Sequence, residues 1–338
     1  MFKPPFIRLS VAPFASLALG VSLMAGASIQ ASAQILVPLA TWGGEKHVIN
    51  AGFVPALEKA LAEIAPGKFK IQEFPNGSLA TDKDMPVGIP TGKVKMGLLT
   101  VGGWSGSVKD VKILEAPTGL TMAQLDDALN NKGLLEVLQA NFAEKQAVLL
   151  GVADLGPPAL VSKKLITTPA EFKGVKVRVF SEGQAETIKA FGGIPVQIGF
   201  AEVYTALQHG AVDAALVGFQ GVESGKLYEV ATFALLPASF FGTTLMGWAA
   251  NPQWLRALSE SDRKSLEKAV RLAAVDDRAA ILKEIDGLKA HYKTKGMTVA
   301  SLEPSAPEFK QWSAATQSIA EKAKASISPK AALAIFGH

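Results

Sequence analysis

The stretch that decides the fold runs from Glu171 to Gln220 and reads EFKGVKVRVFSEGQAETIKAFGGIPVQIGFAEVYTALQHGAVDAALVGFQ. In it, short apolar runs with the composition of strands alternate with segments whose apolar residues have helical spacing. The predicted order is strand, helix, strand, helix, strand, over Val175–Phe180, Gln184–Phe191, Ile194–Ile198, Glu202–His209 and Ala211–Val217. Such alternation is typical of an α/β protein with mainly parallel sheets.

One charged residue interrupts the first of these strands. Arg178 lies between Val177 and Val179, and both valines point to the opposite face of the strand. In one interpretation Arg178 lies on an exposed strand face, solvated beside Lys176. In the other it lies at a cleft, where the planar, bidentate donors of a guanidinium match a carboxylate. The residues of the strand alone leave both interpretations open.

The order of residues in this stretch resembles the solute receptors of TRAP transporters (tripartite ATP-independent periplasmic transporters), the DctP-like family. The pattern of that family is roughly D-L-K-G-x-K-x-R-V, then P-V, then F-x-E-V-Y-x-A-L-Q-x-G-V-V-D-G. The matching segments here are Phe172–Val179, Pro195–Val196 and Phe200–Asp213, with Phe74–Leu79 and Gly92–Met96 as weaker matches upstream. The resemblance covers essentially the whole chain after its first 33 residues.

The resemblance implies a two-lobed α/β periplasmic binding protein, type II-like, with a long helix spanning both lobes. Such a receptor closes on its ligand and delivers it to a separate membrane permease. In the family, the Arg matching Arg178 usually binds the ligand carboxylate, and the Phe matching Phe200 often packs on the ligand. We expect lobe I to comprise residues 34–155 and about 244–284, and lobe II residues 156–243 and about 285–338.

The sequence departs from the family pattern at two places near the expected site. The segment Val212–Val217 lacks the Asn contact that the family usually has near Val217. A second basic residue, often found before the matched Arg, is replaced around Gly156-Pro157-Pro158. Both changes make the predicted site less polar. They favour a small organic acid with one carboxylate and an apolar body over a dicarboxylate or a sialic acid.

Five further residues are candidates for the ligand site. In open α/β sheets, ligands bind at the loops that follow the strands. The candidates in such positions, or on the segment that contains Phe200, are Trp42, His47, Trp104, Gln197 and Phe219. Two of them have an alternative interpretation: His47 as a helix-entry residue facing water, and Trp104 as a cover over the core.

The first 33 residues have the features of an export signal. Lys3 and Arg8 give a positive start, residues 9–33 carry no charge, and Ala31-Ser32-Ala33 is an A-x-A step. This pattern predicts a secretory signal peptide that is cleaved after Ala33, and therefore a periplasmic protein. We find no other apolar run long enough to cross a membrane, which takes roughly 18 residues.

Several classes of function are disfavoured by composition. The chain has no cysteine and four histidines, none of them in an H-E-x-x-H pattern, so we expect no metal site and no cofactor. A G-x-x-x-x-G-K-[ST] phosphate loop is absent. Removal of Lys3 and Arg8 with the signal lowers the net charge from +4 to +2, which gives no case for nucleic-acid binding. No nucleophile, base and orienting group are assembled, so we do not expect an enzyme.

The C-terminal third begins with a clear helix signal. Ser259-Glu260-Ser261-Asp262 is an S-x-x-D capping box, and it opens a predicted helix of roughly thirty residues running toward Lys293. Such a length suits a brace across two lobes. We therefore expect a monomeric transport receptor that works with TRAP permease subunits. The alternatives are a receptor that serves signalling or scavenging, and a secreted enzyme on the same fold.

Overall fold

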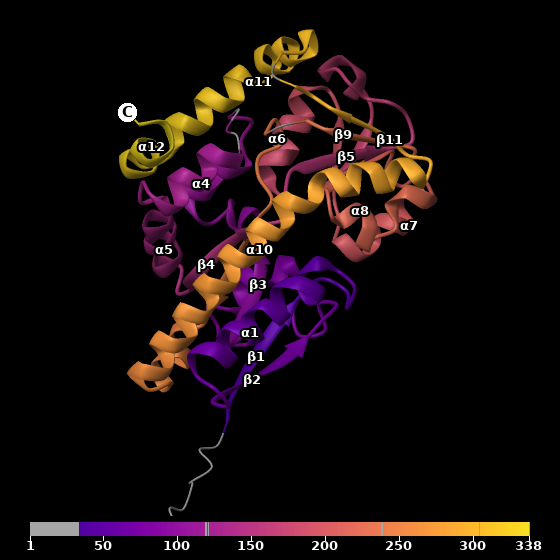
Figure 1. The fold of residues 1–338 in the computed structure, drawn as a ribbon. Helices are drawn as coiled ribbons and strands as arrows, with labels where there is room; N and C mark the ends of the chain where they lie inside the picture. Colours follow the sequence, from indigo (N-terminus) through magenta and orange to yellow (C-terminus); the bar gives the residue numbers. More distant parts are fainter. Residues whose placement is uncertain (1–33, 119, 121, 238, 304, 338) are drawn as a thin grey trace, which may run out of the picture. The chain divides into compact units, whose positions relative to one another are not determined.

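The computed structural model describes residues 34–118, 120, 122–237, 239–303 and 305–337. The predicted signal peptide, residues 1–33, lies outside the described residues. Among those described, the strands form two mixed sheets and the helices pack around them (Figure 1). None of the described helices is both long enough and apolar enough to span a bilayer.

The first sheet has the strand order β2-β1-β3-β10-β4. Its strands are β1 (Ile35–Thr41), β2 (Phe69–Phe74), β3 (Met96–Thr100), β4 (Val148–Asp154) and β10 (Leu245–Ala250). Strand β1 pairs in parallel with β2 and β3, whereas β10 is antiparallel to both of its neighbours. The carboxyl ends of β1, β2, β3 and β4 therefore lie at one edge of this sheet.

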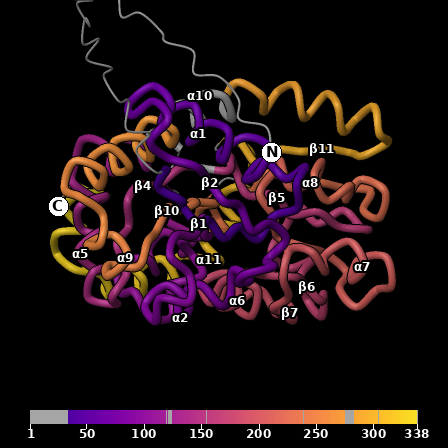
Figure 2. Tube along the Cα trace, turned by 90° about the horizontal axis from the view of Figure 1, so that it is seen from below, coloured from indigo at the N-terminus to yellow at the C-terminus, as the bar shows by residue number. Residues whose placement is uncertain are grey.

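The second sheet has the strand order β11-β9-β5-β8-β6-β7. Its strands are β5 (Pro158–Ser162), β6 (Lys176–Val179), β7 (Ile194–Gln197), β8 (Ala214–Gly218), β9 (Phe233–Leu236) and β11 (Thr298–Ser301). Here β5 is the antiparallel strand, and β6 pairs in parallel with β7 and β8. In Figure 2, β4, β10, β1 and β2 form one group of strands, and β5, β6 and β7 belong to the other.

The helices vary from single turns to the long α10. They are α1 (Val54–Ile64), α2 (Met85–Gly88), α3 (Lys112–Glu115), α4 (Met122–Asn130), α5 (Leu134–Glu144), α6 (Glu182–Ala190), α7 (Val203–Gln208), α8 (Gly221–Ser224), α9 (Pro252–Ala257), α10 (Glu260–Thr294), α11 (Pro307–Ser326) and α12 (Pro329–Phe336). Shorter helical turns include η1 (Ile49–Phe53), η2 (Asp82–Asp84), η3 (Val101–Trp104) and η6 (Phe200–Glu202).

The chain crosses between the two sheets at neighbouring points. It passes from β4 to β5 at residues 155–157 and returns from β9 to β10 at residues 237–244. The two crossings are joined, because the N–H of Leu155 donates to the carbonyl of Thr244 at 3.2 Å. The hydroxyl of Thr244 in turn donates to the carbonyl of Gly156. At this point two linked segments of the chain therefore connect the sheets, instead of a single tether.

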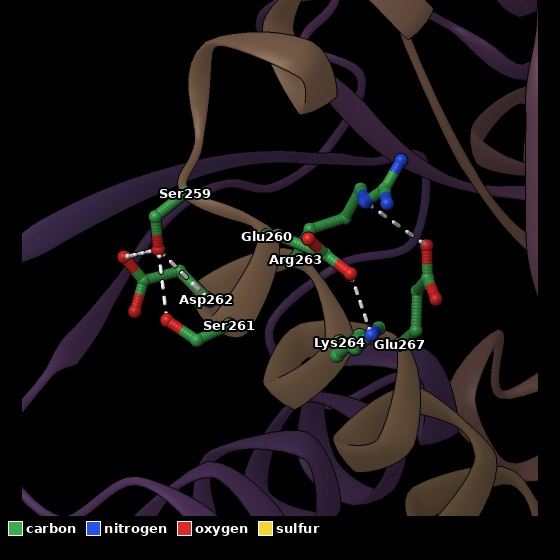
Figure 3. A network of polar contacts seen from close by, with 7 residues as sticks. All are labelled: Ser259, Glu260, Ser261, Asp262, Arg263, Lys264 and Glu267. Atoms are coloured by element: carbon green, nitrogen blue, oxygen red, sulfur yellow. Dashed lines mark hydrogen bonds and ion pairs between the residues drawn. The ribbon is translucent and has the colours of Figure 1, made fainter.

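The predicted capping box begins α10. The Ser259 hydroxyl accepts a hydrogen bond from the Asp262 N–H at 3.1 Å and donates to the Asp262 carboxylate at 2.7 Å (Figure 3). Side-chain capping satisfies an amide that would otherwise have no partner in the first turn. An i,i+4 ion pair, Lys264 to Glu260 at 2.6 Å, follows on the exposed face. The predicted start and length of this helix are confirmed.

Helix α10 contributes side chains to the cores of both sheets. Near its start, Leu266 and Val270 are fully buried in the cluster that covers β1, β3 and β10. Near its end, Tyr292 is fully buried in the cluster beneath β5 and β8, where its hydroxyl donates to the carbonyl of Phe219 at 2.9 Å. The orange helix in Figure 1 therefore acts as the brace that the sequence predicts.

The last helix returns to the side of the first sheet. Ala331 and Ile335 of α12 are buried in one cluster with Leu134 and Phe142 of α5. The Ser328 hydroxyl at the start of α12 donates to Asp110 at 2.7 Å. The lobe boundaries remain a proposal, in which we now place residues 327–337 with lobe I instead of lobe II.

Candidate functional site

A cavity of about 320 Å³ lies where the carboxyl ends of strands from both sheets meet. On one side it is lined by residues that follow β1, β2 and β4, by the last residue of β3, and by η2. On the other side it is lined by β6 and by residues that follow β7 and β8. Ligands of open α/β sheets characteristically bind at such ends. The topology therefore brings together segments that are more than 100 positions apart in the sequence.

Arg178 of β6 lies on the wall of this cavity and is only 5% exposed. Its Nε donates to the carbonyl of Ile198 at 3.1 Å, and its Nη1 donates to the carbonyl of Leu216 at 2.7 Å. These two bonds fix the plane of the guanidinium. The interpretation of Arg178 as a solvated residue on an exposed strand face is therefore wrong.

The charge of Arg178 has no partner at ion-pair distance. Among the described residues, no carboxylate oxygen lies within 4.0 Å of its nitrogens. Burial lowers the pKa of Arg178 to about 10, against the opposing effects of Asp82 and Glu202. The group stays charged at neutral pH. Because a buried charge without a partner is costly, this arrangement favours an anion in the cavity.

Three aromatic rings from the two sides of the cavity meet at one end of it. The Phe200 ring centroid, on η6, lies 5.6 Å from that of Trp42 and 5.0 Å from that of His47, both after β1. Gly221 also lines the cavity and leaves room for Phe200, since a Cβ at Gly221 would lie 3.1 Å from the ring. Phe180, the residue after β6, places its ring centroid 5.5 Å from the Arg178 guanidinium.

His47 is 3% exposed, and burial lowers its pKa to about 4, so it is neutral at physiological pH. Its Nδ1 accepts a hydrogen bond from the N–H of Ile49 at 3.2 Å. In a neutral imidazole the other nitrogen then carries the proton. Nε2 has no hydrogen-bond partner among the described residues, so it is available as a donor to a ligand. The interpretation of His47 as a helix-entry residue facing water is wrong.

Apolar residues occupy the two places where the sequence departs from the family pattern. Val217 lines the cavity near the position where the family usually has an Asn. Leu155, next to Gly156-Pro157-Pro158, lines it near the replaced basic residue. Ile198 adds a third aliphatic side chain. Part of the cavity lining is therefore aliphatic.

Three of the seven predicted site residues are not among the described residues that line the cavity. Trp104 is 1% exposed, because the turn η3 directs its ring into the core, 4.7 Å from the ring of Phe142. Phe219 is fully buried, with its ring 5.0 Å from that of Tyr292 beneath α10. The side chain of Gln197 is exposed at the end of edge strand β7. As ligand contacts these three residues stay predictions, which their positions away from the cavity lining do not support.

Several polar residues of the cavity were not predicted from the sequence, and three of them lie close together. Asp82 and Lys83 lie on η2, and Thr100 ends β3. Lys83 Nζ donates to the backbone carbonyl of Gln197 at 3.1 Å and so connects the two sides of the cavity. The signal that could have identified them is their position, directly after the Phe74–Leu79 motif and at the end of a buried strand.

Much of the quoted motif has a structural role. Glu202 accepts the N–H of Gly199 at 2.9 Å and caps η6, the turn that carries Phe200. Asp213 accepts the N–H of Lys176 at 2.9 Å and so joins the start of β6 to the segment before β8. The described residues contain no group of three or more His, Cys, Asp or Glu side chains placed to hold a metal ion.

Residues 40–326 match the bacterial extracellular solute-binding proteins, family 7 (DctP). The chain belongs to this family. The resemblance predicted from the sequence is thus confirmed, and the protein is an extracytoplasmic solute-binding receptor.

Relatives and solved structures agree with this assignment. A solute-binding protein of Roseobacter denitrificans is 24% identical over 263 residues, which cover 76% of this chain and 79% of that protein. The 2,3-diketo-L-gulonate-binding periplasmic protein YiaO of Escherichia coli is 26% identical over 242 residues, covering 68% of this chain and 71% of that protein. A TRAP periplasmic solute-binding protein from Ralstonia eutropha, solved with (S)-2-acetolactate bound, has a TM-score of 0.80 at 21% identity and covers 90% of this chain and 99% of that chain. The predicted two-lobed α/β fold is confirmed.

Proposed function

We propose that this receptor captures a small organic acid with a largely apolar body and delivers it to the membrane permease of a TRAP transporter. The observation that supports this most strongly is Arg178: a buried, fixed guanidinium on a cavity wall, with no carboxylate of the described chain within 4.0 Å. A ligand carboxylate supplies the missing counter-charge. A relative named for binding 2,3-diketo-L-gulonate and a similar structure solved with acetolactate bound are consistent with an acid as ligand.

The division of roles within the cavity follows from its chemistry. Arg178 holds the carboxylate through its free N–H groups, and the neutral His47 can add one donor from Nε2. Phe200, Trp42 and Val217 pack on the body of the ligand. Because these groups come from both sides of the cavity, ligand binding favours the closed arrangement of the two lobes.

We further propose that the protein binds its ligand without changing it and acts in the periplasm after cleavage behind Ala33. Membership of a receptor family supports the first point, and the sequence pattern of residues 1–33 supports the second. The ligand returned after binding should have an unchanged mass. A chemically altered product would support the alternative of a secreted enzyme.

The proposal is tested by a thermal-shift screen of the protein, purified from the periplasm of a host that expresses the full chain. The protein is first unfolded and refolded to remove any acid bound during expression, and is then screened against a panel of small organic acids. A ligand that binds only the folded state raises Tm. Carboxylates with apolar bodies should give the largest shifts. If no acid raises Tm, or if dicarboxylates alone do, the proposed ligand class is wrong.

A further inference from the structure

A second charged group in the cavity has no role in the function proposed so far. Asp82 lines the cavity, is partly exposed to it, and comes from η2, in the segment that follows the first sheet's β2. No cationic nitrogen of the described residues lies within 4.0 Å of its carboxylate. Lys83, its neighbour, instead donates to the carbonyl of Gln197.

Among the described residues, Thr100 is the one that donates to the Asp82 carboxylate. The N–H of Thr100 donates to Oδ1 at 2.9 Å, and the hydroxyl of Thr100 donates to Oδ2. An ionised carboxylate has about four acceptor positions, so both oxygens retain capacity for a further donor. Thr100 itself is 6% exposed and is fixed at the end of β3. The carboxylate is therefore fixed in position and still able to accept hydrogen bonds from a ligand.

Asp82 and Arg178 interact electrostatically without forming an ion pair. Burial raises the pKa of Asp82 to about 6, while the Thr100 N–H and the charge of Arg178 oppose the rise. Their side chains are separated by more than the 4.0 Å of an ion pair and both face the same cavity. A ligand carboxylate on Arg178 therefore comes close to a second negative charge. A ligand that also presents a hydrogen-bond donor to Asp82 relieves that repulsion.

We propose that Asp82 accepts a hydrogen bond from a hydroxyl or ammonium group that lies beside the ligand carboxylate. This inference rests on the function proposed above and narrows the ligand class to acids that carry a donor near the carboxylate. A donor-free acid leaves Asp82 desolvated and unpaired by the ligand. Asp82 thus selects among acids, whereas Arg178 selects acids from other molecules.

A purely structural role of Asp82, joining η2 to β3, makes a different prediction. In that case the Asp82→Asn substitution changes the affinity for all acids by the same factor, or lowers Tm alone. The selecting role changes the ratio of affinities between acids with and without a donor. The matched control is Asp84→Asn, because Asp84 lies on the same turn, is exposed and caps that turn through Thr81.

The experiment is calorimetric titration of the wild type and both variants with three matched sets of acids. The sets are propionate, lactate and alanine; isovalerate, 2-hydroxyisovalerate and valine; phenylacetate, mandelate and phenylglycine. In the set that binds most tightly, we expect the wild type to prefer a donor-bearing acid over the donor-free acid by about tenfold or more. Asp82→Asn should reduce that preference, more for an ammonium than for a hydroxyl, and Asp84→Asn should retain it.

The outcomes separate this inference from the function on which it rests. If donor-free and donor-bearing acids bind the wild type equally, or if Asp82→Asn leaves their ratio unchanged, the role of Asp82 is refuted while the receptor for acids stands. If none of the nine acids binds, the carboxylate anchor itself is contradicted, and the selecting role of Asp82 is contradicted with it.

Discussion

The substitution Arg178→Lys tests the carboxylate anchor at constant charge. A guanidinium has five N–H donors. In Arg178, two of these N–H groups donate to the carbonyls of Ile198 and Leu216, so three N–H groups remain for a ligand. A lysine ammonium has three donors in all and cannot serve both carbonyls and a carboxylate in the same planar arrangement. At least one charge-assisted hydrogen bond is lost, and each contributes about 1.5–3 kcal/mol.

That loss corresponds to an affinity for the acid about 10- to 150-fold weaker. The assay is calorimetric titration of the wild type and Arg178→Lys with the most tightly bound acid of the screen, after thermal unfolding has shown that the variant is folded. The matched control is Arg256→Lys on α9, where the arginine is exposed and outside the cavity. Equal affinity of wild type and Arg178→Lys would refute the reasoning, since the fork geometry would then contribute nothing.

Four further predictions follow from the site and its surroundings. Phe200→Leu should weaken acid binding at least about fivefold by calorimetry, because it removes two aromatic contacts across the cavity. The control Phe309→Leu on α11 should leave the affinity unchanged. Equal losses of affinity in the two variants would contradict this prediction. Glu115, the last residue of α3, is buried and accepts a hydrogen bond from the Ser181 hydroxyl. Burial raises its pKa to about 8, so the unfolded chain binds fewer protons from about pH 4.5 to 8, and the wild type loses stability as pH rises through that window. Between pH 5 and 8 the Glu115→Gln variant should lose at least about 1 kcal/mol less stability than the wild type, roughly 2–4 °C in Tm, and parallel Tm curves would contradict this. The pKa of His47 is lowered from 6.5 to about 4, so the stability of the wild type falls as pH drops through that window. Between pH 7 and 4.5, His47→Gln should lose about 2–3 kcal/mol less free energy of unfolding than the wild type. Equal losses in denaturant melts would contradict this prediction. The periplasmic protein should have the mass of residues 34–338, and a mass that retains Ala33 would place the cleavage elsewhere.

The sequence predicted the architecture because its signals are local. Alternation of apolar runs with helical spacing in the Glu171–Gln220 stretch corresponds to strands β6, β7 and β8 and helices α6 and α7. The Ser259 capping box marks the start of α10 to within a residue. Local signals do not predict the order in which the strands pair. Strand β10 lies between β3 and β4 in the sheet, although it follows β4 by about 100 residues in the sequence. Register between distant segments depends on tertiary packing.

The site was predicted only where side-chain type and position in a strand together imply a role. Arg178 was identifiable because a charged residue in an apolar strand is costly to bury unless it has a partner. Trp104 and Phe219 have loop positions like that of Trp42, yet they turn into the core, and only the path of the backbone distinguishes these cases. In the sequence, nothing distinguishes Asp82 from the other polar residues of the turn that contains it. The role proposed for Asp82 depends on β3 and β6, which place Thr100 and Arg178 around the same cavity.

The measurement that tests the central claim most directly compares an acid with its own primary amide. The amide has nearly the same shape as the acid and carries no charge, so the difference in affinity isolates the interaction with the buried guanidinium of Arg178. Calorimetric titration of the wild-type protein should show that the acid of the screen binds at least about 30-fold more tightly than its amide, since a half-made ion pair in a desolvated cleft costs about 2 kcal/mol or more. Equal affinities would show that the cavity recognises the body of the ligand without its carboxylate, and would contradict the account.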